Sequence, residues 1–373
     1  MTSQTSHPQT HRALVLHSTS SPPTVEDLPL PAVTPGSALI RILSSPILSY
    51  TSSIISGKRT YPFPTPFIPG SSAIGRIAST GPDATLLAPG QLVWINSFIR
   101  GRDDPTVAIL LGLHEGFTEG SRRLMRGEWK DGTFAEYAKV PLESCFALDE
   151  GRLTGSVSDG GLGYETEKLA YISSLLVPYG GLRDLGLQAG ETVIVAPATG
   201  AFGGAAVQVA LALGARVIAM GRNVDKLKKV ASVSDRVDVV PITGDVEEET
   251  AALKKFGPVD AFFDISPPEA ARTTHVKSGI LALRHGGRVS LMGGIIGDVA
   301  LPYAKIMHSD IQLKGKWMYE REDVTALIQM VRAGVLKLDQ VEVVGKFELG
   351  EWEKAFQVAK ENADMGQLVL MTP

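Results

Sequence analysis

Two patterns of apolar and polar residues divide the chain. From about residue 190 to 300, short apolar runs alternate with segments in which apolar residues recur at helical spacing. The runs are rich in Val, Ile and Ala and lie at 192–197, 216–220, 237–242, 259–266 and 287–292. Runs of this length indicate buried strands, and their alternation with helices predicts a parallel, doubly wound sheet.

The first 150 residues show β-like runs with no helical segments between them. These runs are separated by Pro, Gly and Ser and lie at 13–17, 38–43, 73–78 and 92–96. They favour an antiparallel, barrel-like domain, and the proline-rich stretch 61–70 indicates an extended loop. After about Leu301 a mixture of strands and helices runs to the C-terminus, so we expect the chain to return to its first domain.

We therefore predict an α/β protein of about two domains, as its 373 residues also suggest. The barrel-like catalytic domain takes residues 13–160 and 302–373, and the doubly wound domain takes residues 161–301. Residues 1–12 are polar and lack the apolar segment of a signal peptide, which predicts a disordered tail.

The strand–turn–helix unit that begins near Glu191 carries the strongest functional signal. Its turn reads Ala-Thr-Gly-Ala-Phe-Gly over residues 198–203, with Ala198 where a G-x-G-x-x-G motif has its first glycine. A lone G-x-x-G is typical of an ordinary strand–helix turn, but the flanking strands and helix favour a dinucleotide site. Its glycines let backbone N–H groups approach a pyrophosphate at the helix N-terminus. The predicted contacts are Ala198, Thr199, Gly200, Phe202 and Gly203.

The end of the next strand indicates which dinucleotide binds. An NAD site expects Asp or Glu there to accept a hydrogen bond from the ribose 2′-OH. This strand ends in Gly221-Arg222-Asn223, and Lys226 follows. The two cations are suited to a 2′-phosphate, so we predict NADPH as the cofactor. The alternative is that Arg222 and Lys226 are solvated surface cations.

Composition narrows the range of partners. The chain has 36 basic and 40 acidic residues, a net charge of −4 and no basic stripe, so nucleic acid is not an expected partner. No run of eighteen apolar residues occurs, so no membrane span is expected. The one cysteine, Cys145, and the absence of a recognisable targeting signal lead us to expect a cytoplasmic protein that acts on a small molecule.

Several short motifs, in this order, resemble those of the medium-chain dehydrogenase/reductase superfamily. They are Ile68-Pro69-Gly70 with Gly75, Pro89-Gly90-Gln91-Leu92-Val93, Gly132-Thr133-Phe134-Ala135-Glu136-Tyr137, residues 178–182 and residues 207–215. The resemblance covers nearly the whole chain. It implies a GroES-like catalytic barrel split around a Rossmann domain, and a homodimer formed through the sheet edge near Val289–Val299.

The chain departs from the zinc-containing members of that superfamily where they hold metal. Leu48 stands at the position of their catalytic cysteine, and Ser71-Ser72 stands at their His-Glu pair. Residues 97–131 occupy the place of their four-cysteine lobe and contain no cysteine. Because zinc needs three or four Cys, His or carboxylate ligands, we predict no metal site.

Two tyrosines are the candidates for catalysis. Tyr50 lies in the segment that carries a metal ligand and a proton-relay residue in zinc members, and Tyr61 matches a tyrosine near the active site of quinone-oxidoreductase-like members. Each hydroxyl either donates to a developing oxyanion or only packs against its loop. The insertion 97–131 is either a substrate wall or a solvated lid. Its candidate pocket residues are Phe98, His114, Phe117 and Trp129, with His114 also a candidate general acid.

Further cofactor contacts are expected at the carboxyl ends of the strands, where open α/β sheets bind their ligands. Ser266 follows one strand, and Met292, Gly293 and Gly294 follow the next. The resemblance also places Tyr179, in the helix before the nucleotide motif, near the nicotinamide.

Zinc-lacking members of the superfamily mostly resemble quinone oxidoreductases and enoyl reductases, which reduce an activated C=C bond with NADPH. The leading hypothesis is therefore a zinc-independent NADPH-dependent reductase of an α,β-unsaturated carbonyl compound or quinone. Leu48 and Thr51 stand where quinone reductases have an N-x-x-D signature. This leaves two alternatives, a zinc-independent carbonyl reductase of the alcohol-dehydrogenase type and a non-catalytic NADPH-binding protein. The sequence does not indicate the substrate.

Overall fold

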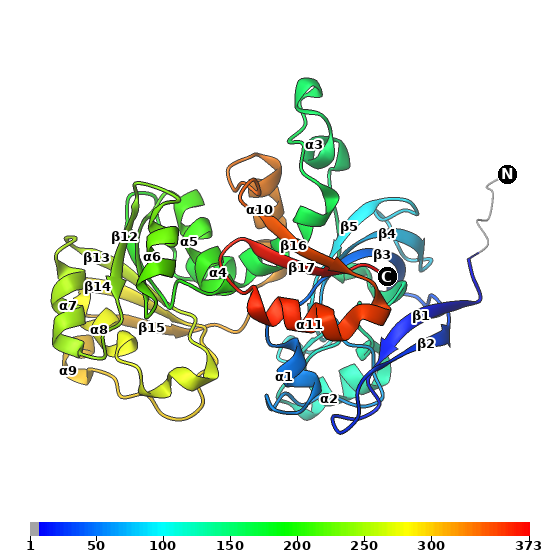
Figure 1. Cartoon of the computed structure of the whole chain (residues 1–373), viewed down its shortest axis with the longest axis horizontal. Coiled ribbons are helices and arrows are strands. Elements are labelled where there is room, and N and C mark those ends of the chain that lie inside the picture. Colours follow the sequence, from blue (N-terminus) through cyan, green and yellow to red (C-terminus); the bar gives the residue numbers. More distant parts are fainter. Residues whose placement is uncertain (1–6) are drawn as a thin grey trace. The chain divides into compact units, whose positions relative to one another are not determined.

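The computed structural model describes residues 7–373, which divide into two compact units (Figure 1). Unit 1 comprises residues 7–173, 338–363 and 367–373, and unit 2 comprises residues 174–337 and 364–366. The predicted boundaries at 160/161 and 301/302 are both too early. The return to unit 1 comes at Leu338, because the strand at 312–315 joins the parallel sheet and holds residues 302–337 in unit 2.

Unit 2 is built on a six-stranded parallel sheet with the order β12-β11-β10-β13-β14-β15. The strands are β10 Thr192–Ala196, β11 Arg216–Gly221, β12 Val237–Pro241, β13 Val259–Asp264, β14 Leu283–Leu291 and β15 Gln312–Gly315. Every residue of β10 is buried, as expected of a Val-rich strand covered on both faces. β10 pairs with β11 on one side and β13 on the other, so their carboxyl ends border the point where such sheets bind ligands.

Helices connect these strands. They are α4 Ile172–Asp184, α5 Ala201–Ala212, α6 Val224–Ala231, α7 Val246–Lys254, α8 His275–Ala282, α9 Tyr303–His308 and α10 Arg321–Arg332. α7 begins after Asp245, whose carboxylate accepts hydrogen bonds from the N–H groups of Glu247 and Glu248 at 2.8 and 3.0 Å. The segment from Pro268 forms a 3₁₀ turn, and α8 begins at His275.

The edge of the parallel sheet differs from the prediction. β14 is hydrogen-bonded to β13 on one side and to β15 on the other, so the predicted edge near Val289–Val299 is wrong. The edge strand is β15, and all four of its residues are exposed. The prediction failed because residues 312–315 had been assigned to the other domain.

Unit 1 contains a seven-stranded sheet in which most neighbours are antiparallel. Along it lie β16-β17-β3-β4-β5-β9, with β8 also paired to β3. The strands are β3 Ser37–Pro46, β4 Ala73–Thr80, β5 Leu92–Ile95, β8 Tyr137–Pro141, β9 Cys145–Ala147, β16 Glu342–Phe347 and β17 Gln367–Met371. The predicted α/β architecture, a GroES-like β domain split around a Rossmann-like parallel sheet, is confirmed.

Shorter elements complete unit 1. They are the hairpin β1 Thr10–Val15 and β2 Thr24–Pro29, the hairpin β6 Phe98–Arg100 and β7 Ala108–Leu110, and the helices α1 Thr51–Ile55, α2 Glu119–Leu124, α3 Glu150–Thr154 and α11 Trp352–Glu361. A π-helical turn covers Met125–Trp129, and 3₁₀ turns cover Leu142–Ser144, Val157–Asp159, Thr166–Tyr171 and Leu349–Glu351.

The N-terminal segment is ordered earlier than predicted. β1 begins at Thr10, and His11 is buried with its ring edge-on to Tyr137. The predicted disordered tail therefore extends too far toward Arg12, while its first six residues lie outside the described range. Among residues 7–373, the helices lack the combination of length and hydropathy that a membrane span requires.

Candidate functional site

The two glycines of the turn between β10 and α5 have different surroundings. A Cβ on Gly203 would lie 1.9 Å from the carbonyl oxygen of Pro197, whereas a Cβ on Gly200 would meet no atom within 4 Å. Gly203 is therefore required for α5 to pack against the turn, and Gly200 faces open space. No side chain caps the start of α5. An open glycine before an uncapped helix N-terminus fits the pyrophosphate of a dinucleotide.

The end of β11 holds one cation without a partner. Arg222 is exposed and forms no ion pair or side-chain hydrogen bond within the described chain. The other two predicted polar contacts have local partners. Asn223 caps α6 by accepting the Lys226 N–H at 3.0 Å, and the Lys226 ammonium pairs with Asp364. Gly221 lets Thr199 pack closely, since a Cβ there would lie 2.8 Å from Thr199 Cγ2.

A buried polar network joins the end of β13 to the start of α8. The Ser266 hydroxyl donates to Asp264 and lies 2.7 Å from His275 Nε2, while His275 Nδ1 lies 2.7 Å from the Thr273 hydroxyl. Asp264, Ser266 and His275 are each at most 3% exposed. The predicted cofactor contact from Ser266 is therefore wrong for its side chain, because that hydroxyl is buried and already satisfied on both sides.

The loop after β14 is also occupied by internal contacts. The Met292 N–H donates to the Asp264 carbonyl at 3.0 Å, and the Gly294 N–H donates to the Ser266 carbonyl at 2.8 Å. A Cβ on Gly293 would lie 2.5 Å from Asp264 Oδ2. These residues were predicted to offer backbone donors to the nicotinamide. The N–H groups of Met292 and Gly294 are not available for that, and Gly293 serves the close approach of the two loops.

Tyr179 lies in α4 with its ring buried. Burial raises the pKa of Tyr179, and the positive charge of Arg183 offsets part of that increase. Arg183 is paired with Asp323 of α10 at 3.0 Å. The predicted position of Tyr179 beside the nicotinamide stays a prediction.

Tyr50 and Tyr61, the predicted catalytic residues, lie together in unit 1. Their ring centroids are 6.4 Å apart. Between them lies Arg59, whose guanidinium carbon is 4.0 Å from the Tyr50 ring centroid and 4.9 Å from that of Tyr61. Arg59 Nη2 donates to the Tyr61 hydroxyl at 3.0 Å. Burial raises the pKa of Tyr50 well above its ordinary value. The Tyr50 hydroxyl therefore stays protonated near pH 7 and can donate a hydrogen bond.

His114 extends this cluster. Its ring lies 5.0 Å from Tyr61 and 5.0 Å from Phe117. Burial lowers the pKa of His114 to about 4, so the ring is neutral near pH 7. The Gly116 N–H donates to Nδ1 at 2.9 Å, which places the single ring proton on Nε2. His114 is therefore a neutral hydrogen-bond donor, and the general-acid role considered for it would need a charged imidazolium.

The other two residues of the predicted substrate wall belong to the core. Phe98 and Trp129 are 5% and 8% exposed. Trp129 packs in one apolar cluster with Ile99, Ile109 and Met125, because the π-helical turn folds it inward. A pocket role for Phe98 and Trp129 stays a prediction. His114 is also buried, at 6% exposed, whereas Phe117 is 71% exposed.

An apolar cavity occupies the positions where zinc members hold their metal. Leu48 and Ser71 line it together with Thr51, Pro69 and Leu113. Ser72 points elsewhere, since its buried hydroxyl donates to the Ile95 carbonyl at 2.7 Å. Within residues 7–373, no three His, Cys, Asp or Glu side chains are grouped as metal ligands. The donor set at this place does not fit a zinc ion.

Arg59 was missed by the sequence analysis. The signal was modest, a basic residue two positions before Tyr61 in the segment Gly57-Lys58-Arg59. Nothing in the spacing showed that the chain would turn its guanidinium onto both tyrosines. The observed cluster in unit 1 therefore comprises Tyr50, Arg59, Tyr61, His114 and Phe117 and is named the aromatic–arginine cluster below.

The sequence matches two family models, "Alcohol dehydrogenase GroES-like domain" over residues 34–150 and "Zinc-binding dehydrogenase" over residues 201–333. It is similar to an acryloyl-coenzyme A reductase from Metallosphaera sedula, 27% identical over 314 residues that cover 82% of this chain and 84% of the relative. It is also similar to an L-threonine 3-dehydrogenase from Anaeromyxobacter sp. (strain Fw109-5), 25% identical over 359 residues that cover 93% and 94%.

Among solved structures, the fold is similar to that of a protein from Sinorhizobium meliloti 1021 described as a zinc-binding dehydrogenase bound to NADP. The TM-score is 0.75, the sequence identity is 19%, and the match covers 98% of this chain and 100% of that one. At this level of identity the likeness concerns the fold alone.

Proposed function

The chain belongs to the medium-chain dehydrogenase/reductase superfamily, and on that premise we propose that it is a zinc-independent, NADPH-dependent reductase of small α,β-unsaturated carbonyl compounds or quinones. The observation that carries the proposal is the aromatic–arginine cluster. It offers the hydrogen-bond donors Tyr61 and Arg59. Thr51 and Leu113, which are the chain neighbours of Tyr50 and His114, line the cavity together with Leu48 and Ser71, which stand in place of metal ligands.

Hydrogen-bond donors suit conjugate reduction. Addition of a hydride to the β-carbon of an enone moves negative charge onto the carbonyl oxygen, and donors can hold that charge without a Lewis acid. A proton from water then completes the α-carbon. Tyr50 and Tyr61 supply aromatic surface for a conjugated substrate. The similarity to an acryloyl-coenzyme A reductase supports C=C reduction.

Unit 2 supplies the elements for the cofactor. NADPH, when bound, provides the hydride. The residues that would hold it are Gly200 and the N-terminal turn of α5 for the pyrophosphate, and Arg222 for the 2′-phosphate. Lys226 is a weaker candidate because its ammonium already pairs with Asp364. A structural neighbour bound to NADP supports a nicotinamide cofactor.

The test is a substrate panel with product identification. An enone, an enal, a quinone, a saturated ketone and a saturated aldehyde are each mixed with enzyme and NADPH, and the products are separated. The proposal expects saturation of the alkene with the carbonyl intact, no loss of rate in the presence of a chelator, and no stoichiometric zinc in the purified protein. Alcohol products alone would overturn it.

A second candidate function is reduction of a saturated ketone or aldehyde. The similarity to an L-threonine 3-dehydrogenase favours it, and the same hydrogen-bond donors would then protonate an alkoxide. Alcohol products in the panel would select this function. Tight NADPH binding without turnover of any compound would instead favour a non-catalytic binding protein.

The expected homodimer remains a prediction. With β14 inside the sheet, the edge strand next to the predicted region is β15, whose unpaired backbone groups a second copy would cover. Size-exclusion chromatography with light scattering checks it, and a monomer over the whole concentration range would exclude it.

A further inference from the structure

Arg59 is the half-buried cation of the aromatic–arginine cluster. It forms no ion pair with an Asp or Glu within residues 7–373, and its side-chain partner is the Tyr61 hydroxyl. Several other arginines of unit 1 have a carboxylate partner, as Arg76 has Glu150 and Arg126 has Glu115. A cation held among aromatic rings without a counter-ion has lost part of its hydration, and an anion or oxyanion at this point would restore that loss.

One donor of Arg59 is left over. Its Nε atom is buried and has no hydrogen-bond acceptor, whereas Nη2 is used by Tyr61. Buried N–H groups in folded proteins are nearly always paired. An unpartnered Nε–H in a cluster that includes a candidate catalytic hydroxyl is therefore expected to find its acceptor in a bound molecule.

The backbone fixes Arg59 in this place. α1 ends in a turn at Gly57, which has a φ of +70°, a conformation that favours glycine. The Arg59 N–H donates to the Ser53 carbonyl at 2.8 Å, and the Tyr61 N–H donates to the Arg59 carbonyl at 2.9 Å. This loop folds back on α1, at whose N-terminus Tyr50 lies. The guanidinium is thus held between the two tyrosines by hydrogen bonds of the main chain.

We infer that Arg59 is the electrophile of this site, and that its guanidinium receives the carbonyl oxygen of the substrate, directly through Nε–H and indirectly through Tyr61. The inference rests on the proposed function and adds a substrate requirement. The substrate must present an oxygen acceptor conjugated to its C=C bond, and that oxygen must reach the guanidinium that lies between the two tyrosine rings. A guanidinium then takes the part that a metal ion has in zinc-containing enzymes of this type.

The electrons balance without a further reactant. A hydride adds to the β-carbon, the C=C pair becomes a bond between the α-carbon and the carbonyl carbon, and the carbonyl π pair moves to oxygen. The enolate oxygen is held by Arg59 Nε–H and by the Tyr61 hydroxyl, whose own oxygen accepts from Arg59. Water protonates the α-carbon and the carbonyl re-forms. The alkene is reduced, NADPH is oxidised to NADP⁺, and Arg59 and Tyr61 keep their protons.

The variants are chosen to separate charge, shape and folding. Arg59→Met removes the charge at similar length, Arg59→Lys keeps a charge without the guanidinium fork, and Arg59→Ala leaves room for added ethylguanidinium. Arg123→Met is the matched control, since Arg123 is an exposed arginine of α2 with no ion pair in the described chain. The readouts are kcat and KM with NADPH and the best enone of the panel, and thermal unfolding of every variant.

Loss of the electrophile is expected to lower kcat of Arg59→Met by about 100-fold with a smaller change in KM, as for removal of an oxyanion donor. Arg59→Lys is expected to be intermediate, ethylguanidinium to restore part of the activity of Arg59→Ala, and Arg123→Met to match the wild type. A kcat of Arg59→Met within about threefold of the wild type overturns the inference. So does a loss that follows reduced thermal stability and is not rescued by ethylguanidinium.

A binding measurement keeps the two proposals apart. trans-Cinnamate has a planar conjugated carboxylate that mimics the enolate, and its affinity for the NADP⁺-saturated protein can be measured by calorimetry without turnover. The inference expects Arg59→Met to weaken that binding by about tenfold or more while Arg123→Met leaves it unchanged. If the wild type reduces nothing in the panel, the proposed function fails, and cinnamate binding that depends on Arg59 still upholds the oxyanion site. Cinnamate binding that is equal in Arg59→Met and wild type overturns it.

Discussion

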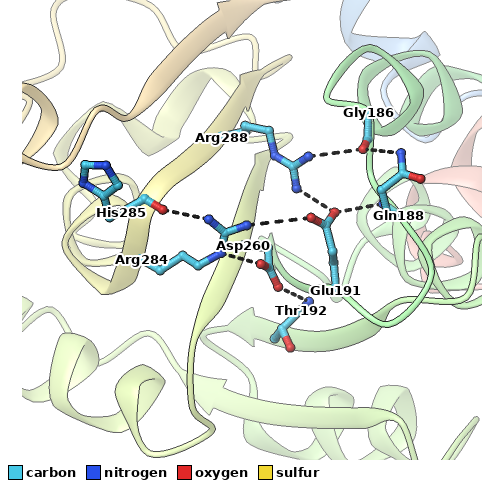
Figure 2. A network of polar contacts seen from close by, with 8 residues as sticks. All are labelled: Gly186, Gln188, Glu191, Thr192, Asp260, Arg284, His285 and Arg288. Atoms are coloured by element: carbon cyan, nitrogen blue, oxygen red, sulfur yellow. Dashed lines mark hydrogen bonds and ion pairs between the residues drawn. The ribbon is translucent and has the colours of Figure 1, made fainter.

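Charged side chains are paired at the amino end of the parallel sheet in unit 2, whereas one is left unpaired at the carboxyl end. At the amino end, carboxylates and guanidiniums from β13, β14 and the start of β10 pair with one another (Figure 2). At the carboxyl end, Arg222 follows β11 with no ion pair in the described chain. Both ends belong to the same parallel sheet, although the paired charges lie on β10, β13 and β14 and Arg222 follows β11.

The amino-end network pairs its charges, although Arg288 Nε is buried without a hydrogen-bond acceptor among the described residues. Glu191 accepts from Arg288 at 2.6 Å and from the Gln188 N–H at 2.8 Å. Asp260 accepts from Arg284 at 2.6 Å and from the Thr192 N–H at 2.7 Å. Figure 2 shows both guanidiniums directed toward these two carboxylates. Two negative and two positive groups cancel, so this end joins three strands and leaves no net charge for a ligand.

The carboxyl end is open where the cofactor is proposed to bind. Gly200 faces empty space, and α5 begins without a side-chain cap. The buried Asp264–Ser266–His275 network follows β13 in the same sheet, and its polar groups bond to one another. The comparison teaches that a polar group indicates function when it lacks a protein partner, and indicates stability when its partners are complete. Arg222 and Arg59 meet the first condition.

The largest effect is expected from adding a side chain to the turn at the carboxyl end of β10. Gly203→Val places atoms where a Cβ already lies 1.9 Å from a carbonyl oxygen, so the unfolding free energy is expected to fall by about 3 kcal/mol or more. Urea unfolding measures it. Gly200→Ala is the matched control, expected to keep its stability within about 1 kcal/mol while NADPH binds about tenfold more weakly. A Gly203→Val protein as stable as the wild type would contradict this account of the turn.

Opening the amino-end network should cost stability and spare the cofactor. Glu191→Gln leaves Arg288 without its charge partner, and both side chains are 18% exposed. The unfolding free energy is expected to fall by about 2 kcal/mol, with the Kd for NADPH unchanged. Glu119→Gln is the control, because that residue pairs with Arg122 while its side chain is 87% exposed. It should change stability by less than about 0.5 kcal/mol. Weaker NADPH binding in Glu191→Gln would refute the separation of the two ends.

In unit 1, the dependence of stability on pH tests whether His114 is buried without a charge. Burial lowers the pKa of His114 to about 4 from an ordinary value of 6.5. Between these values the unfolded chain binds a proton and the folded chain does not, so this histidine makes stability fall as pH drops from about 6.5 toward 4. Between pH 7 and pH 5 the loss is expected to be about 1 to 2 kcal/mol larger in the wild type than in His114→Gln. Equal slopes for the two proteins would show that His114 titrates normally.

The smallest effect expected is that of Arg222→Ala. The Kd for NADPH should rise by about tenfold, because a charge-assisted contact to the 2′-phosphate is lost. The Kd for NADH should be unchanged, as should the midpoint of unfolding, since Arg222 is exposed and unpaired. Fluorescence titration with both cofactors checks it. An equal loss of affinity for NADPH and NADH would remove Arg222 from the 2′-phosphate site.

The sequence by itself determined the order of elements and the place of the nucleotide turn. Apolar runs of β-branched residues predict strands such as β10 and β13, and Asp245 marks the start of α7. These signals are local, because a strand or a capped helix depends on residues a few positions apart. The position of Arg222 directly after a strand can likewise be read from neighbouring residues. In the structure its side chain is exposed, as a contact to the 2′-phosphate requires.

Only the tertiary structure decided which polar groups are available. Ser266 was expected at the cofactor, yet its hydroxyl is satisfied by Asp264 and His275. Arg183 of α4 pairs with Asp323, which is 140 residues away in the sequence. Arg59 was not expected, and its role depends on a backbone turn that sets its guanidinium between two rings. A residue type states what a side chain can donate or accept. Whether that capacity is already used depends on neighbours that are distant in sequence and are brought together only by folding.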